Sequence, residues 1–289
     1  MKRTIIFALF IVSILPAEAQ LLWKISGNGL KKDSYLFVSH PLIPVAFLDS
    51  VPGLYKAYNS CGTVISEINI NTIDASAKLR RAASIPDYKT VADYVSVDTF
   101  NLVDKELREL LKIGLKEMSA MRPEIILDFY KAELFKQLTG ISDDAQSDSY
   151  FQMAAVEMGK KVIGLEDIDK HISTLTNQKN IKDDTKILVS NVLHKDSLSK
   201  ELLNLSRLYR KGKINDLHLL LQPHTNNAEQ NNNTDMINNR VSDWLKKLPP
   251  VIYNKSCFIT VDLKYAAGSN GLIEGLQKAG FKVKAVEKL

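Results

Sequence analysis

The pattern of apolar and polar positions divides the chain into a strand-rich start, a helical middle and a strand–helix–strand end. Near the start, two short apolar runs, Leu21–Ile25 and Ser34–Ser39, flank the sequence Gly27-Asn28-Gly29. A Gly/Asn turn between two such runs predicts a β-hairpin. We expect a short helix at Val51–Tyr58 and then a strand at Thr63–Asn69.

Apolar residues in the middle of the chain recur at helical spacing. The face that predicts the first long helix consists of Val103, Leu107, Leu110, Leu111, Leu115 and Met118. Arg122-Pro123 should end this helix, because proline disrupts helix interiors, and a second helix is expected over Glu124–Leu138. The remaining predicted elements are a helix at Ser147–Met158, a short buried strand at Lys161–Leu165 and a pair of helices over Ile187–Leu221 that bends near Gly212.

The end of the chain predicts a strand, a glycine-rich turn, a helix and a last strand. An apolar run that starts at Phe258 is interrupted by Gly268 and Gly271, an amphipathic segment follows, and Gly280–Val286 closes the unit. Strands at both ends and helices between them predict an α/β fold with a central mixed sheet and a helical middle section.

Residues 222–239 are rich in asparagine and include Asn231-Asn232-Asn233. A segment of this composition buries too little apolar surface to offset the entropy lost on ordering, so we expect a mobile loop. Predicted helices flank it on both sides. The chain from residue 20 to residue 289 is therefore expected to be one domain with a long loop.

The first 19 residues have the features of a secretory signal peptide. Lys2 and Arg3 precede the apolar stretch Ile5–Leu15, and Ala17-Glu18-Ala19 is a typical cleavage site. The apolar stretch is too short to cross a bilayer, and no second long one follows. We expect cleavage after Ala19 and an extracytoplasmic protein, periplasmic or secreted, without a transmembrane segment.

Charge and cysteine content narrow the function classes. The chain has 38 basic and 33 acidic residues, a formal charge of +5, and the two signs are interspersed. This mixture is typical of a solvated surface rather than a nucleic-acid interface.

Cys61 and Cys257 each precede a predicted strand. Either they pair as a disulfide in an oxidising compartment, or they are two small buried thiols.

Several local motifs resemble the TraB/GumN family, relatives of the Tiki metal-dependent proteases. They are the tryptophan-containing strand Trp23–Ser26, the Ser-Tyr-Leu-Phe strand at Ser34–Phe37, and the Gly-x-x-Gly-Leu turn at Gly268–Leu272. The resemblance extends over essentially the whole mature chain. It implies a single domain of the TraB/GumN (Tiki-like) type.

The resemblance also implies a site. The family pattern contains two Gly-x-x-His motifs, an early glutamate and a late arginine; two imidazoles and a carboxylate could hold a divalent metal, and the arginine could stabilise an oxyanion. Glu67 falls on the glutamate, and Arg240, four residues before Trp244, falls on the arginine, although Val241 replaces the asparagine that follows it. The alternatives are an outward-facing glutamate and a surface arginine.

Both histidine positions differ from the family pattern. Pro41 stands at the first, and His40 lies one residue early, which in a strand turns a side chain to the opposite face. Tyr265 stands at the second and Asp262 at its glycine position. A tyrosine hydroxyl titrates near 10 and is a poor ligand for most divalent metals. The chain is therefore expected to have lost the metal, unless a local insertion or deletion restores His40, or Asp262 and Tyr265 form an altered site.

Two further acidic residues match frequent family positions. Asp148 opens a predicted helix, where it can cap free amide groups. Glu166 follows a predicted strand and either faces the cleft or supplies a negative charge to a helix N-terminus. The other four histidines lack ligand spacing and receive no role; they are His171, His194, His218 and His224. The chain has no His-Glu-x-x-His, Gly-x-Ser-x-Gly or P-loop motif.

The leading hypothesis from the sequence is an exported protein with little or no hydrolase activity. It would bind a peptide or an envelope partner in the inherited cleft, would use no cofactor and would not bind nucleic acid. The competing hypothesis is an active metal-dependent peptidase that uses a divalent metal, His40, Glu67 and a nonstandard ligand.

Overall fold

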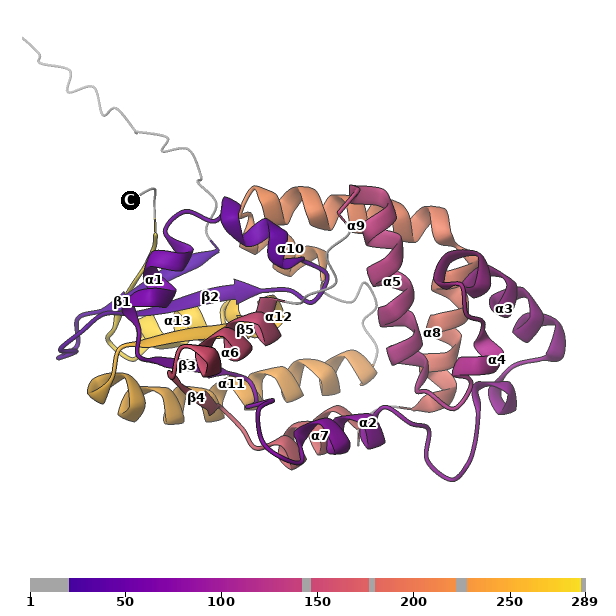
Figure 1. The fold of residues 1–289 in the computed structure, drawn as a ribbon, viewed down its shortest axis with the longest axis horizontal. Helices are drawn as coiled ribbons and strands as arrows, with labels where there is room; N and C mark the ends of the chain where they lie inside the picture. The colour runs from indigo at the N-terminus through magenta and orange to yellow at the C-terminus, as the bar shows by residue number, and fades with distance from the viewer. Residues whose placement is uncertain (1–20, 142–146, 177–179, 222–227, 287–289) are drawn as a thin grey trace, which may run out of the picture.

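The computed structural model describes residues 21–141, 147–176, 180–221 and 228–286 (Figure 1). The predicted signal segment, His224 with the rest of residues 222–227, and the side chain of Asp148 lie outside the described residues. The expectations that concern them therefore remain predictions.

Six strands form one mixed sheet in the order β4-β3-β5-β2-β1-β6. Neighbouring strands among β4, β3, β5 and β2 are parallel, and β1 is antiparallel to both β2 and β6. The strands are β1 (Leu22–Ser26), β2 (Ser34–Ser39), β3 (Thr63–Ser66), β4 (Lys161–Gly164), β5 (Cys257–Asp262) and β6 (Lys282–Ala285).

The helices of the first half are η1 (Val45–Ser50), α1 (Leu54–Ser60), α2 (Ala75–Ala82), η2 (Val91–Tyr94), α3 (Val97–Leu111), α4 (Leu115–Met118), α5 (Pro123–Thr139) and α6 (Ser147–Glu157). Those of the second half are α7 (Ile168–Thr176), α8 (Ile181–Leu193), α9 (Lys195–Arg210), α10 (Ile214–Leu220), α11 (Ala228–Asn254), α12 (Leu263–Ala266) and α13 (Leu272–Lys278). The predicted α/β fold, with a mixed sheet and a helical middle section, is confirmed.

The two ends of the chain meet in the sheet. The first hairpin forms as predicted, and β2 pairs with β5 so that Ser39 lies opposite Asp262. After β5, Gly268 has a φ of 84°, a left-handed conformation that glycine adopts at little cost, and the chain turns there into α13. This geometry explains why the C-terminal sequence reads as strand, turn and helix.

Aromatic side chains fill part of the core between the sheet and its helices. Phe37 of β2 and Phe258 of β5 both contact Phe151 of α6, with ring centroids 5.7 and 4.8 Å apart. Tyr58 of α1 packs against the same group. Burial of these large rings holds α1 and α6 to the central strands.

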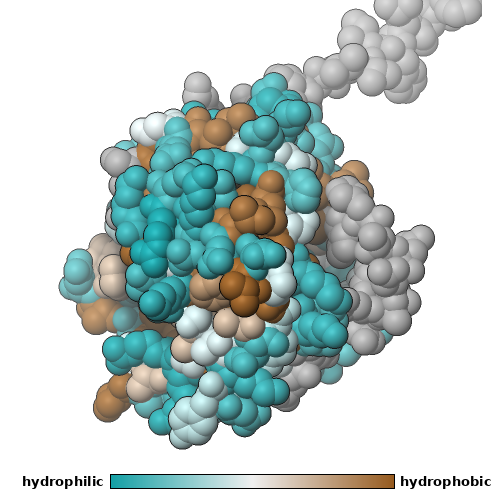
Figure 2. Space-filling view, turned by 90° about the vertical axis from the view of Figure 1, so that its right-hand side faces the viewer, coloured by the Kyte–Doolittle hydropathy of each residue, from teal (hydrophilic) through white to brown (hydrophobic). Residues whose placement is uncertain are grey.

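Helices α3, α5, α8 and α9 pack against one another beside the sheet, at the right in Figure 1. Figure 2 shows this end of the molecule, where apolar side chains lie among hydrophilic ones. Leu102 of α3 and Ile187 of α8 are among the exposed apolar residues. Within the described residues, no helix combines the length and the apolar character needed to cross a membrane.

Three predicted elements require correction. The helix expected over residues 103–118 ends at Leu111, because Lys112 adopts a left-handed φ of 65° and caps it. The strand expected to reach Asn69 ends at Ser66, so Glu67 lies just after it. Strand β4 was expected to be buried, but it lies at the edge of the sheet and its residues are exposed or half-buried.

A mobile loop was predicted over residues 222–239, but residues 228–239 form the start of α11. From Ile237 onward, apolar residues recur every three or four positions and pack into the core. Tertiary burial of such a face can stabilise a helix in spite of a weak local propensity. The residues of this face are Ile237, Val241, Trp244, Leu248 and Ile252.

Cys61 and Cys257 are both free and buried in the structure. They lie close to adjacent strands, since Thr63 of β3 is in register with Cys257 of β5. The Cys61 thiol contacts the hydroxyl of Ser256 at 3.4 Å. The structure therefore agrees with two buried thiols and not with a disulfide.

Candidate functional site

The candidate residues gather at one edge of the sheet. His40 follows β2, Glu67 follows β3, Glu166 lies two residues after β4, and Asp262 is the last residue of β5. These four strands run parallel, so their carboxyl ends meet at the same edge. Ligand sites of open α/β sheets form at this edge.

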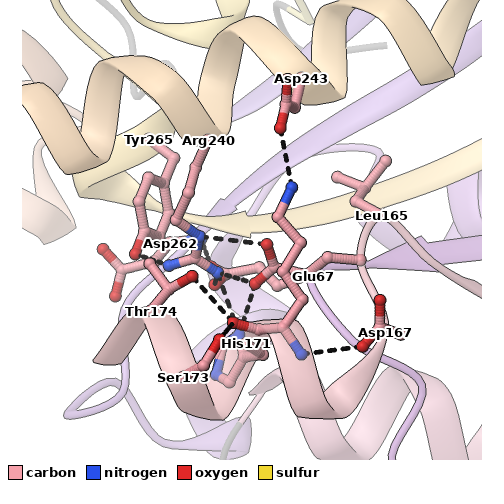
Figure 3. A network of polar contacts seen from close by, with 12 residues as sticks. Glu67, Leu165, Asp167, His171, Ser173, Thr174, Arg240, Asp243, Asp262 and Tyr265 are labelled. Atoms are coloured by element: carbon pink, nitrogen blue, oxygen red, sulfur yellow. Dashed lines mark hydrogen bonds and ion pairs between the residues drawn. The ribbon is translucent and has the colours of Figure 1, made fainter. Parts of the chain in front are cut away.

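Arg240, which projects from α11, brings three of the other candidates together (Figure 3). Its Nε and Nη2 donate to the two carboxylate oxygens of Glu166, and Nη2 also donates to Glu67 Oε2 at 3.2 Å. Its Nη1 donates to the Tyr265 hydroxyl. The planar guanidinium thus uses three of its nitrogens on partners from three different segments, as its fixed fork of donors allows.

His171 of α7 also belongs to this cluster, although the sequence analysis gave it no role. Its Nδ1 lies 2.7 Å from Glu166 Oε1 and 3.0 Å from Arg240 Nη2. The two hydrogens of Nη2 are directed at Glu67 and Glu166, so none remains for the imidazole. We therefore assign a proton to His171 Nδ1, which donates to Glu166.

Two aromatic rings enclose the guanidinium. The Arg240 Cζ lies 4.9 Å from the centre of the Trp244 ring and 4.5 Å from that of the Tyr265 ring. The two rings meet edge to face, with centroids 4.9 Å apart. Trp244 is one turn further along α11, which explains the four-residue spacing in the sequence. Both rings are fully buried, so this cation–π contact is shielded from water.

Backbone groups fix the carboxylates in place. Glu67 Oε1 accepts a hydrogen bond from the backbone N–H of Asp262 at 3.0 Å, which joins the ends of β3 and β5. The Asp262 carboxylate in turn accepts from the N–H of Lys264 and caps α12. An ion pair of 2.7 Å between Lys170 and Asp243 holds α7 against α11. These contacts connect the end of β3 with β5 and α12, and α7 with α11, around the cluster.

Burial and charge act in opposite directions on the groups around Arg240. Burial alone would raise the pKa of Glu166, but the hydrogen bond from His171 and the charge of Arg240 hold that pKa below its ordinary value. Burial raises the pKa of Tyr265 to about 12, so this hydroxyl stays protonated at neutral pH. The cluster consequently holds ionised carboxylates, a guanidinium and a neutral phenol.

The depressed pKa of Glu166 predicts an acid-sensitive contribution to stability. Because the pKa is lower in the folded state, the contribution is complete above the unfolded value of about 4.5 and disappears as the pH falls below it. Glu166→Gln should therefore flatten the fall in unfolding free energy between neutral pH and pH 3, measured by urea titration. Asp98→Asn, at an exposed position of α3, is the control. An equal fall in unfolding free energy in the natural protein and in Glu166→Gln would contradict the prediction.

The residues present do not fit the divalent metal that the family resemblance implies. Pro41 offers no donor atom, and Tyr265 is buried, protonated and bonded to Arg240. The two carboxylates, Glu67 and Glu166, already face a fixed positive charge. Among the described residues, no group of three or more His, Cys, Asp or Glu side chains could hold a metal ion.

His40 and Asp262 line a separate pocket at the same sheet edge, about 760 Å³ in volume. Its lining residues come from the ends of β2 and β5 and from helices α5, α9, α10 and α11. Of the candidates, the structure thus brings Glu67, Glu166, Arg240 and Tyr265 into one cluster, and His40 into the neighbouring pocket. The backbone bond from Asp262 to Glu67 connects the two.

The structure resolves two alternatives left open by the sequence. Arg240 is only 3% exposed, so it is not a surface arginine, and the Glu67 side chain is paired with Arg240, so it does not face outward. The signal that could have identified His171 was its spacing from Ile168 and Ile172, which places it on the inward face of a helix that starts just after Glu166. A search for metal-ligand spacing could not find it, because its partner is an arginine-bound carboxylate.

A comparison with protein families agrees with this geometry. A model of the TraB/PrgY/gumN family matches residues 21–285, nearly the whole chain. No curated protein and no solved structure matches the chain significantly. On the strength of the family match, together with the mixed sheet and the residues gathered at its carboxyl edge, the chain belongs to the TraB/PrgY/gumN family.

Proposed function

We propose that this protein is an exported, non-catalytic member of its family that binds a peptide or an envelope protein at the carboxyl edge of the sheet. The observation that carries the proposal is the position of Arg240. Its guanidinium lies between Glu67 and Glu166, where a cation is needed to balance one buried and one half-buried carboxylate.

A fixed guanidinium cannot replace a catalytic metal. Hydrolysis by a metal ion requires an open coordination position at which a water molecule is activated. The donors of Arg240 are instead directed at Glu166, Glu67 and Tyr265, and two rings shield it. This arrangement supports a structural role for the cluster and leaves the neighbouring pocket as the place for a ligand.

The pocket has the dimensions of a binding site. Its volume of about 760 Å³ lies within the range of natural ligand sites, and its walls combine apolar and charged side chains. The alternative hypothesis needs His40 and Glu67 at one metal. Glu67 is held by Arg240 and by the backbone of Asp262, whereas His40 faces the pocket.

A peptide-cleavage assay tests the absence of catalysis. The mature protein, purified without chelator, is incubated with a mixture of peptides in zinc, cobalt or manganese, with and without a chelator. We expect no cleavage above that seen with the Glu67→Gln variant or with the control Glu106→Gln, which lies on α3 outside the cluster. Cleavage that disappears both with chelator and in Glu67→Gln, but not in Glu106→Gln, would refute the proposal.

Export is a separate part of the proposal and rests on the signal-like segment at residues 1–19. N-terminal sequencing of the protein from its native host should give a mature chain that begins at Gln20, in an extracytoplasmic fraction. A chain that still begins at Met1 in the soluble cytosolic fraction would show that the segment is not a signal peptide.

A further inference from the structure

The pocket beside the arginine cluster contains a hydrogen-bond donor that no described residue accepts. His40 is 9% exposed and lines the pocket. Its Nδ1 accepts a hydrogen bond from the backbone N–H of Leu42 at 3.2 Å. Burial lowers the pKa of His40, so the ring is neutral at pH 7 and carries its hydrogen on Nε2. That hydrogen is available to a ligand.

Two lysines stand near this donor. Lys131 of α5 and Lys264 of α12 line the same pocket, and their positive charges are close enough to lower the pKa of His40 further. Within the described part of the chain, neither ammonium forms an ion pair. The Lys264 ammonium lies over the ring of Tyr265, at 4.9 Å from its centre. Burial opposes the charge of Lys264, but Asp262, Tyr265 and Glu67 raise its pKa, so this ammonium stays charged. An imidazole N–H and two ammonium groups can donate to an anionic ligand.

The acidic residues of the pocket restrict which anion can bind. Of the charged neighbours of His40, Asp262 has the largest effect on its pKa and opposes the lysines. Asp128 and Glu201 also line the pocket, and Asp128 lies one helical turn before Lys131 on α5. Three carboxylates would repel a doubly charged group such as phosphate more strongly than a single carboxylate. The charges of the pocket therefore favour a monoanion over a dianion as the partner of His40, Lys131 and Lys264.

The rest of the wall is largely apolar. Leucines come from the segment after β2 and from α9 and α10, and Met236 and Ile237 come from α11. The glycine-rich turn, residues 267–271, forms another part of the wall. Such a wall can accommodate an aliphatic side chain next to the anionic end. The leucines are Leu42, Leu202, Leu205, Leu219 and Leu221.

We propose that this pocket recognises the free C-terminal carboxylate of a peptide that ends in an aliphatic residue, with His40, Lys131 and Lys264 as the groups that bind the carboxylate. The inference rests on the proposed function, which places a peptide ligand at this edge of the sheet. It adds the end of the peptide that is bound and the chemistry that selects it.

The test compares two forms of one peptide on the mature protein. Isothermal titration uses N-acetyl-Ala-Ala-Leu with a free carboxylate and the same peptide as its C-terminal amide; the acetyl group removes the competing amine. We expect the acid to bind at least about tenfold more tightly than the amide, because the amide loses charge-assisted hydrogen bonds. Inorganic phosphate should not compete.

Variants assign the effect to the named residues. Lys131→Gln and Lys264→Gln should each reduce the preference for the acid several-fold, and His40→Ala should do the same, whereas His40→Gln retains an N–H donor and should recover part of the affinity. Lys282→Gln, at an exposed position of β6, is the matched control and should leave binding unchanged. Circular dichroism confirms that each variant is folded.

Equal affinity for the acid and the amide, no binding of either peptide, or a preference that the lysine variants leave intact would overturn the inference. Equal binding of both forms would leave peptide binding itself standing. Cleavage of these peptides that requires metal would instead refute the proposed function, so the two failures can be told apart.

Discussion

Replacing Arg240 by methionine should lower the free energy of unfolding by about 3–5 kcal/mol, because it leaves the buried Glu166 carboxylate without its counter-charge. Glu166 is 4% exposed and has the guanidinium and His171 as its polar partners. Methionine has a similar length and apolar body, so the loss would come from the charge and the hydrogen bonds rather than from a cavity. Urea unfolding at pH 7 measures the change.

The matched control lies on the same helix. Lys246→Met removes a positive charge from an exposed side chain whose ion pair with Asp243 is 3.4 Å long, and should change stability by less than about 0.5 kcal/mol. The double variant Arg240→Met with Glu166→Gln should be more stable than Arg240→Met alone. A double variant that is less stable than Arg240→Met would show that an unbalanced carboxylate is not the cause.

Truncation of Trp244 to alanine should cost about 3–5 kcal/mol, the usual range for removal of a large buried aromatic side chain. Trp244 is 1% exposed, and its ring contacts both the guanidinium of Arg240 and the ring of Tyr265. The substitution would therefore open a cavity and also free the arginine to move. Thermal and urea unfolding of the variant measure the loss.

Trp244→Phe separates these two contributions. Phenylalanine keeps an aromatic face over the guanidinium. Trp244→Phe should therefore lose less than half of the unfolding free energy that Trp244→Ala loses. In a double-mutant cycle, Trp244→Ala and Arg240→Met should be coupled, since the two side chains are in contact. Strictly additive effects would mean that the ring does not support the arginine.

Much of the sheet could be predicted from the sequence. Its strands contain alternating or continuous apolar residues, and strong turn signals lie between them. The strand at Ser34–Ser39 and the turn around Gly268 lie where the local pattern places them. The break at Lys112 could not be predicted, since lysine has no marked preference for the left-handed conformation that it adopts there. The start of α11 was also missed, because its asparagines mask an apolar face that begins only at Ile237.

The candidate site was predicted only in part. Glu67 and Arg240 could be placed from the family resemblance, and the structure joins them directly. The division between an arginine cluster and a separate pocket could not be predicted, because it depends on how α11 packs across the ends of β3, β4 and β5. His171 was missed because its partner, Glu166, lies on a turn whose direction no local pattern reveals.

The central claim is that Arg240, and not a metal ion, balances the carboxylates at this edge of the sheet. It is tested most directly by isothermal titration of the mature protein with zinc, cobalt and manganese. The account predicts no one-to-one binding of micromolar or tighter affinity, because Pro41 supplies no ligand and Tyr265 and the carboxylates are engaged by the guanidinium. A one-to-one site of that affinity, abolished by Glu67→Ala or by His40→Ala, would contradict it.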